Sequence, residues 1–214
     1  MELMKPSSLN KVRNLYEASA DSYAEMMDKE IELPMYKDVL GRLQKDIANT
    51  PGVLLDTACG SGHMLAMFRS YYDTQRSQIG IDISPRMVAI AQMRLGKEGS
   101  VMVGDMRSLP GIDSSSVAAV INFFAFHHLN ADGIRKSMLE WNRVLVPGGR
   151  LLVAAWEGSG TIDYGQESDI IALRYMRNEL TEIAEKSRLI VTRCTVEPVE
   201  DFPMDAIYLE CVKE

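Results

Sequence analysis

The chain is poor in cysteine, in positive charge and in long apolar runs. Its three cysteines are widely spaced and odd in number, so they indicate neither a disulfide framework nor a metal-binding pattern. Lysine and arginine total 23 against 30 acidic residues, and they are scattered, which disfavours a nucleic-acid substrate because phosphate contacts need clustered positive charge. The longest apolar stretch, residues 117–126, is interrupted by Asn122 and is too short to span a bilayer. The first residues have no signal-peptide core, so we expect a cytoplasmic protein.

The composition otherwise matches an ordinary globular protein, with 46% hydrophobic and 25% charged residues. At 214 residues the chain is most simply one domain. We expect an N-terminal helical cap at residues 1–50, a ligand-binding core at 51–157, and a C-terminal helix with strands at 158–214. No group of histidine and acidic residues has the spacing of metal ligands, so no metal site is predicted.

Short apolar runs alternate with amphipathic segments from residue 52 onward, which predicts an α/β sandwich. Ser84 opens a predicted helix that Gly96 ends. Residues 7–49 have helical spacing with a break near Asp21, and a last helix is expected at 167–184. Strands are expected near 52–56, 78–82, 100–103, 117–122, 149–155, 188–196 and 206–213.

The most informative segment is a buried strand that ends in an acid and leads into a glycine-rich turn, residues 53–62. Such a turn lets a ligand approach the backbone, and the helix that follows offers unpaired N–H groups and a positive dipole end. A second apolar run ends in Asp82, 22 positions after Gly60. A carboxylate at this place accepts two hydrogen bonds from ribose hydroxyls, so the segment predicts a nucleotide-type site.

The glycine turn does not complete the dinucleotide fingerprint. The pattern Gly-x-Gly-x-x-Gly/Ala needs a small residue where this chain has Leu65, and Asp56 is a poor neighbour for a pyrophosphate. A ligand with an ammonium, a sulfonium and one carboxylate suits this mixture of acid and glycine better. A nicotinamide-dependent oxidoreductase remains the less favoured alternative.

Four motifs follow one another between residues 50 and 157: LLDTACGSG, GIDISPRM, VGDM and VLVPGGRLLVAAW. With them the chain resembles the class I S-adenosylmethionine-dependent methyltransferases, and among these the small-molecule enzymes of the ubiquinone/menaquinone-methyltransferase type. The resemblance implies a Rossmann-like three-layer sandwich with a seven-stranded, mostly parallel sheet, an antiparallel last strand and an N-terminal helical lid. It also implies S-adenosyl-L-methionine as cofactor and S-adenosyl-L-homocysteine as product.

The resemblance also assigns contacts to the cofactor. Gly60 is expected under its methionine part, Asp56 near its ammonium, and Asp82 on its ribose hydroxyls. Asp105 and the backbone N–H of Met106 are expected at the adenine. The complete set of expected cofactor-binding residues is Asp56, Ala58, Gly60, Gly62, Asp82, Ile83, Met87, Gly104, Asp105, Met106, Asn122, Tyr16 and Tyr23.

Methyl transfer needs a base only where the nucleophile has to lose a proton. His127 and His128 follow the fourth predicted strand, just ahead of a helix N-terminus, and are the predicted catalytic residues. A positive dipole end lowers a histidine pKa and favours the neutral, base-competent form. The expected substrate-binding residues are Phe123, Trp156 and Tyr164.

The expected function is methyl transfer to the oxygen or nitrogen of a small organic acceptor by in-line displacement. The segment after Asn122 lacks the two prolines of the Asn/Asp-Pro-Pro-aromatic pattern, which disfavours DNA, tRNA-base and glutamine acceptors. We therefore expect a small-molecule acceptor, no nucleic acid, no membrane, and a monomer or homodimer. A protein that binds the cofactor without transferring its methyl group is the second hypothesis. Phe124 and Phe126 are expected in the aromatic core.

Overall fold

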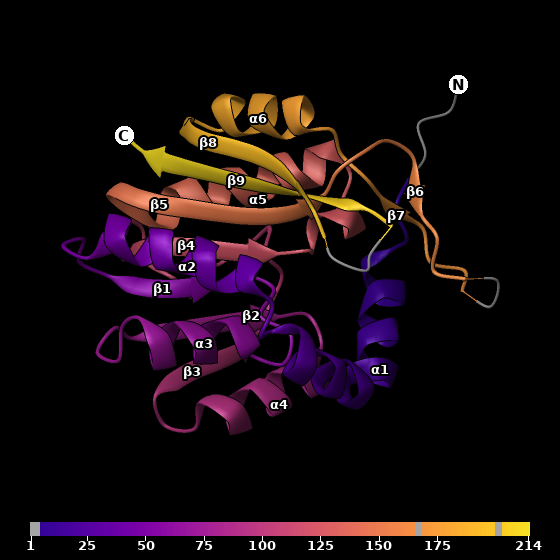
Figure 1. Ribbon diagram of the computed structural model, residues 1–214, viewed down its shortest axis with the longest axis horizontal. Coiled ribbons are helices and arrows are strands. Elements are labelled where there is room, and N and C mark those ends of the chain that lie inside the picture. Colours follow the sequence, from indigo (N-terminus) through magenta and orange to yellow (C-terminus); the bar gives the residue numbers. More distant parts are fainter. Residues whose placement is uncertain (1–4, 166–167, 200–202) are drawn as a thin grey trace.

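A seven-stranded sheet forms the centre of the part of the chain that this computed structural model describes, residues 5–165, 168–199 and 203–214 (Figure 1). The strand order is β3-β2-β1-β4-β5-β9-β8. The strands are β1 (Val53–Asp56), β2 (Gln78–Asp82), β3 (Gly99–Val103), β4 (Val117–Phe123), β5 (Leu145–Trp156), β8 (Leu189–Pro198) and β9 (Asp205–Lys213). Neighbouring strands from β3 to β5 are parallel, whereas β9 pairs antiparallel with both β5 and β8. The predicted sheet with its antiparallel last strand is confirmed.

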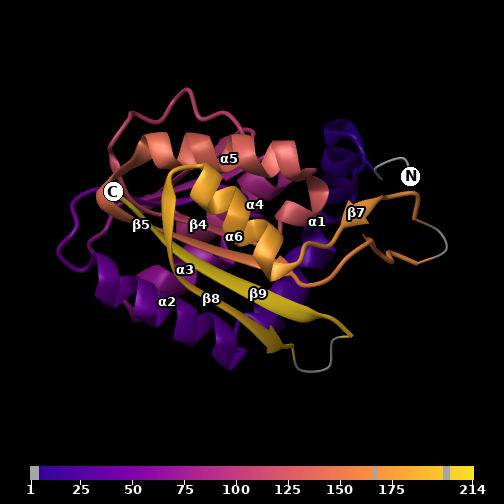
Figure 2. The same cartoon turned by 90° about the horizontal axis from the view of Figure 1, so that it is seen from above.

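Helices cover both faces of the sheet and its carboxyl edge. The helices are α1 (Leu9–Glu30), α2 (Pro34–Ile47), α3 (His63–Tyr71), α4 (Pro85–Leu95), α5 (Ala131–Val144) and α6 (Arg177–Lys186), with a short 3₁₀ turn η1 (Phe126–His128). Figure 2 shows α5 and α6 on one face and α2 on the other, while Figure 1 shows α1 beyond the ends of the parallel strands. A separate hairpin pairs β6 (Thr161–Ile162) with β7 (Ala172–Leu173). None of the helices within the described ranges has the length and apolarity that crossing a bilayer requires.

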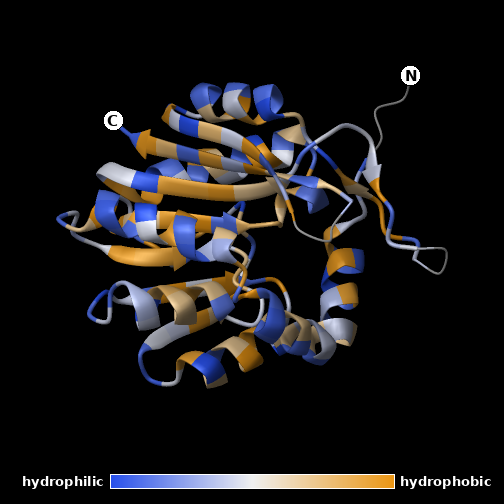
Figure 3. Cartoon of the chain, in the orientation of Figure 1, coloured by the Kyte–Doolittle hydropathy of each residue, from blue (hydrophilic) through white to orange (hydrophobic). Residues whose placement is uncertain are grey.

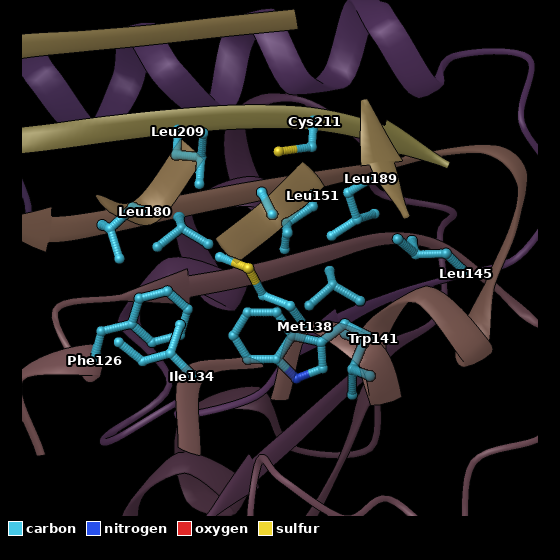
Figure 4. Close-up of a cluster of buried hydrophobic side chains, with 14 of the residues drawn as sticks. Phe126, Ile134, Met138, Trp141, Leu145, Leu151, Leu180, Leu189, Leu209 and Cys211 are labelled. Carbon is cyan, nitrogen blue, oxygen red and sulfur yellow. The ribbon is translucent and has the colours of Figure 1, made fainter. Parts of the chain in front are cut away.

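Two apolar layers hold the helices on the sheet. Strands at the centre of the molecule carry mainly hydrophobic residues (Figure 3), as expected for strands covered on both faces. Trp141 of α5 is fully buried and stacks on Phe126 (Figure 4). The ring centroids are 5.5 Å apart and the ring planes are 7° from parallel. Phe126 thus belongs to the core, as expected.

Local signals set several element ends. The Ser84 hydroxyl accepts a hydrogen bond from the Met87 N–H and caps α4, and Gly96 ends that helix with a positive φ of 60°. Along the chain, β2 and β3 therefore lie before and after this helix, where they were predicted.

Two predicted helix features are wrong. The first helix has no break near Asp21, because that residue is exposed and pairs with Arg86 at 2.7 Å while the buried face of α1 continues through it. The last helix begins at Arg177 instead of Glu167, because residues before it pair as β7 and the Glu179 carboxylate accepts from the Met176 N–H at 2.8 Å.

Candidate active site

Two adjoining pockets lie at the carboxyl edge of the parallel strands, against α1. The smaller measures about 70 Å³ and the larger about 670 Å³. Both are lined by Tyr16, Tyr23, Ala58, Phe123 and Phe124, so they share a wall. Ligand pockets typically measure roughly 300–1,000 Å³. The larger pocket falls within this range, whereas the smaller one lies below it and has α1 as one of its walls.

Most of the predicted site residues line these two pockets. The smaller pocket contains Tyr16, Tyr23, Ala58, Gly60, Asp82, Ile83, Met87, Asp105, Met106, Phe123 and His128. The larger pocket adds Asp56, His127, Trp156 and Tyr164. The acids that end β1 and β2, and the acid that follows β3, therefore meet in one region, as the topology of a parallel sheet requires.

The glycine turn and Asp82 are joined by backbone hydrogen bonds. Gly60 has a φ of 50°, a conformation that glycine adopts at little cost, and its N–H donates to Asp82 Oδ2 at 2.9 Å. The Ser84 N–H donates to Asp82 Oδ1, also at 2.9 Å. Each carboxylate oxygen keeps acceptor capacity beyond these bonds. Burial raises the pKa of Asp82 above its ordinary value in spite of the backbone donors.

Asp56 is a buried carboxyl group with little compensation. It is 2% exposed, and its Oδ1 accepts one hydrogen bond, from the Ala58 N–H at 3.2 Å. Burial raises the pKa of Asp56 to about 7, and the charge of Asp82 adds to the increase. Within the described ranges neither acid forms an ion pair with a basic side chain.

Asp105 lines the smaller pocket, and its carboxylate forms an ion pair with Arg107. Arg107 Nε lies 3.0 Å from both carboxylate oxygens, and its Nη2 lies 2.6 Å from Oδ2. Burial raises the pKa of Asp105, but the hydrogen bonds and charge of Arg107 outweigh burial and hold that pKa below its ordinary value. The expected contact of Asp105 with adenine stays a prediction. The Met106 N–H, in contrast, has no hydrogen-bond partner among the described residues.

Three expected cofactor residues do not line either pocket. Asn122 is fully buried, and its amide donates to Thr57 Oγ1 at 3.1 Å. A Cβ at Gly62 would lie 3.0 Å from Ala91 Cβ, and one at Gly104 would lie 2.8 Å from a side chain of β2. Asn122 thus joins β4 to the residue that follows β1. Gly62 and Gly104 lie in closely packed positions beside the pockets.

His127 and His128 lie in η1 with their side chains bonded to tyrosines. Tyr16 Oη lies 2.8 Å from His128 Nε2, and Tyr164 Oη lies 3.0 Å from His127 Nε2. Burial lowers the pKa of His128 to about 4, and burial together with the charge of His128 lowers the pKa of His127. Both rings are neutral near pH 7, as predicted, but burial rather than a helix dipole is the main cause.

Phe124 was expected in the core, but it is half-buried and lines both pockets. Its φ of 51° lies in the left-handed region, which costs a non-glycine residue about 1–3 kcal/mol. Its ring stacks on Trp156 with centroids 4.3 Å apart, and its N–H donates to the Ala154 carbonyl at 2.8 Å. In this backbone conformation the ring of Phe124 forms part of the wall that the two pockets share. A phenylalanine gives no local signal for such a conformation.

The comparison with protein families decides the identity of this site. Residues 54–149, which run from β1 through α5 into β5, match the family model described as a methyltransferase domain. This part of the chain is a methyltransferase domain. The predicted resemblance to methyltransferases is confirmed by this match. Its finer assignment to the ubiquinone/menaquinone type stays a prediction.

Relatives of this methyltransferase are named for tRNA. A probable tRNA methyltransferase 9B of Homo sapiens is 30% identical over 162 residues, which cover 75% of this chain and 32% of the relative. A tRNA (carboxymethyluridine(34)-5-O)-methyltransferase of Arabidopsis thaliana is 35% identical over 105 residues, which cover 49% of this chain and 24% of the relative. The chain thus spans about a third or less of the length of these relatives.

A solved structure shows the same fold over the whole chain. Magnesium protoporphyrin IX methyltransferase from Synechocystis PCC 6803, with bound SAH, has a TM-score of 0.74 and 17% sequence identity. The match covers 97% of this chain and 100% of that one. The Rossmann-like methyltransferase architecture is confirmed by this likeness.

The tRNA relatives contradict the prediction of a small-molecule acceptor without nucleic acid. Net charge misled the prediction because it sums over the whole surface, whereas phosphate contacts are local. The missing prolines misled it because that pattern concerns amide and exocyclic amino nitrogens, whereas one relative is named for an oxygen.

Helix α1 closes this methyltransferase site through polar contacts that the sequence analysis did not anticipate. Glu17 Oε1 accepts from the Ser84 hydroxyl at 2.8 Å and from the Arg86 N–H at 3.0 Å. Asp28 Oδ1 lies 2.7 Å from His63 Nε2, which ties the end of α1 to the glycine turn. These contacts hold α1 against α4 and the start of α3, and the lid role of α1 stays a prediction.

Proposed function

We propose that this methyltransferase transfers the methyl group of S-adenosylmethionine to an oxygen or nitrogen of a tRNA nucleoside bound in the larger pocket. The observation that carries the proposal is the matched domain, whose two uncompensated carboxyl groups, Asp56 and Asp82, lie beside an aromatic pocket of about 670 Å³. The named tRNA relatives support the choice of acceptor.

The residues of the site fit this cofactor by their chemistry. Asp56 and Asp82 are buried without a basic partner in the described part of the chain, which favours a ligand that carries ammonium and sulfonium charges. The free acceptor capacity of Asp82 suits a vicinal diol, and the unpartnered Met106 N–H suits a ring nitrogen. Gly60 lines the smaller pocket, where a Cβ would lie 3.4 Å from the Tyr23 ring.

When bound, S-adenosylmethionine supplies a methyl carbon that the acceptor's lone pair attacks while the C–S bond breaks and its electron pair stays on sulfur. The protein has to align the acceptor and exclude water. The rings of Phe123, Phe124 and Trp156 form the apolar walls for this purpose. A hydroxyl or amine acceptor loses a proton, which the neutral imidazole of His127 or His128 accepts and passes to water.

Calorimetry and label transfer test this function together. We expect S-adenosylmethionine and S-adenosylhomocysteine to bind, and methyl-tritiated cofactor to leave acid-precipitable label in bulk tRNA that ribonuclease releases. The Asp82→Ala variant is the negative control, because it loses a predicted cofactor contact. Absence of cofactor binding at millimolar concentration contradicts the methyltransferase, and label that appears only outside RNA contradicts the tRNA acceptor.

A further inference from the structure

The larger pocket combines an apolar lining with a negative electrostatic bias. Its apolar walls are formed by the aromatic and methionine side chains of Tyr16, Tyr23, Met26, Met27, Met35, Tyr36, Met64, Phe123, Phe124, Trp156 and Tyr164. Its two acids are Glu30 and Asp56, and Lys29 is the one lysine or arginine among the described residues that line it. Lys29 is exposed, so water and salt screen its charge.

Glu30 directs its charge into this pocket. It is the last residue of α1 and is half-buried. Its carboxylate has no hydrogen bond or ion pair in the described part of the chain. Burial raises the pKa of Tyr36 to about 12, and the charge of Glu30 is the second cause. Glu30 also contributes to the raised pKa of Tyr23, after burial. Both phenols line the pocket, so the carboxylate acts on its interior.

Neither histidine that lines the larger pocket balances these acids. Burial lowers the pKa of His63, whose Nε2 lies 2.7 Å from Asp28 Oδ1. His127 lines the larger pocket and is 5% exposed, and burial holds its pKa well below the ordinary value. Its Nδ1 has no hydrogen-bond partner among the described residues. A neutral imidazole offers a hydrogen bond but no charge. With the proposed cofactor ammonium at Asp56, an anionic group in this pocket meets the carboxylate of Glu30, which is unpaired among the described residues.

We propose that the acceptor group of this enzyme is uncharged, a hydroxyl or amine attached to a ring, and that Glu30 excludes carboxylate acceptors. The proposal rests on the proposed function. Transfer of a carboxylate from water into an apolar site is costly unless a partner compensates its charge, and like charges nearby add to that cost. This chain therefore differs in acceptor chemistry from its Arabidopsis relative, which is named for carboxymethyluridine.

Two nucleosides of the same shape test the proposal. 5-Carbamoylmethyluridine and 5-carboxymethyluridine differ only in an amide against a carboxylate, so their affinities for the protein saturated with S-adenosylhomocysteine isolate the effect of charge. At pH 8 we expect the amide to bind wild type about tenfold more tightly, which corresponds to about 1.4 kcal/mol of charge repulsion. Calorimetry measures both dissociation constants, with each probe as a free nucleoside and within an anticodon stem–loop.

Variants of α1 locate the source of the discrimination. Glu30→Gln should reduce the preference for the amide, and Glu30→Arg should reverse it. Glu25→Arg makes the same change in net charge on the exposed face of α1 and should leave the preference intact. Equal effects of Glu25→Arg and Glu30→Arg would overturn the role of Glu30, because overall charge would then explain the result.

The remaining outcomes are equally decisive. The proposal is overturned if wild type binds the carboxylate as tightly as the amide. It is also overturned if wild type binds neither probe at millimolar concentration, whether as a free nucleoside or within the stem–loop. A preference seen only within the stem–loop supports an acceptor held in RNA, and the same preference with free nucleosides supports recognition of the ring alone. S-adenosylhomocysteine binding separates the two proposals: if it fails, the proposed function fails, and if it persists, only the exclusion of carboxylates fails.

Discussion

The two sides of the active site use opposite chemistry. The cofactor side, residues 56–60, 82–87 and 105–106, presents carboxylates and backbone groups at the ends of three neighbouring strands. The acceptor side, residues 123–128 and 156–164, presents stacked rings and neutral histidines. In the proposed function, charge and hydrogen bonds recognise the sulfonium cofactor, whereas shape and the absence of compensating charge select the acceptor. The contrast predicts that substitutions on the cofactor side change affinity and those on the acceptor side change turnover.

The largest effect is expected on the cofactor side, from Asp82→Ala. The substitution removes a carboxylate that holds the glycine turn through Gly60 and faces the smaller pocket. Hydrogen bonds to charged groups contribute about 1.5–3 kcal/mol, so the dissociation constant of S-adenosylhomocysteine should rise about tenfold to a hundredfold. Calorimetry measures this, with Asp113→Ala in an exposed loop as control. An unchanged dissociation constant would show that Asp82 does not contact the cofactor.

A smaller loss is expected on the acceptor side, from His127→Gln and His128→Gln. Positioned bases typically contribute roughly 10²–10⁴ in rate, but a pKa of about 4 makes His128 a weak base. We expect kcat to fall about tenfold with cofactor affinity nearly unchanged. Because both rings are already neutral, wild-type kcat should be flat between about pH 6 and 7. A fall of wild-type kcat centred near pH 6.5 would contradict the burial of these histidines. Equal losses of kcat and of cofactor affinity in the glutamine variants would indicate a structural role.

The pH dependence of cofactor affinity separates Asp56 from the acceptor side. The folded protein raises the pKa of Asp56 to about 7 by burial, so the group gains protons as the pH falls below 7. A cationic ligand binds the ionised form, and its affinity should fall about fivefold between pH 7 and pH 6 with proton release on binding. Calorimetry in buffers of different ionisation enthalpy measures both quantities. Asp56→Asn should remove the dependence; a dependence that survives in this variant would assign it to another group.

The smallest effect is expected from the lid that joins the two sides. Glu17→Gln weakens the contact of α1 with Ser84 and Arg86 and should speed dissociation of S-adenosylhomocysteine severalfold in stopped-flow experiments. Glu25→Gln, on the exposed face of the same helix, is the matched control. Equal dissociation rates for the two variants would mean that α1 does not limit release.

Sequence-based prediction succeeded where a residue's role follows from its own neighbours. The apolar runs that end in Asp56 and Asp82 identified two strand ends, and Gly60 identified the turn between a strand and a helix. It failed where roles depend on distant segments. Nothing local distinguishes Glu17 on α1, which contacts Ser84 and the backbone of Arg86 more than sixty residues away.

The order of strands and helices, the glycine turn and the acids at the strand ends follow from the amino-acid sequence alone, because hydrophobic period and turn chemistry act over a few residues. The acceptor pocket follows only from the tertiary structure. Its walls come from α1, the end of β4, η1 and the segment after β5, which the fold brings together across more than a hundred residues. Burial in that assembly neutralises His127 and His128 and sets the electrostatic bias around Glu30, and burial depends on packing that no short stretch of sequence specifies.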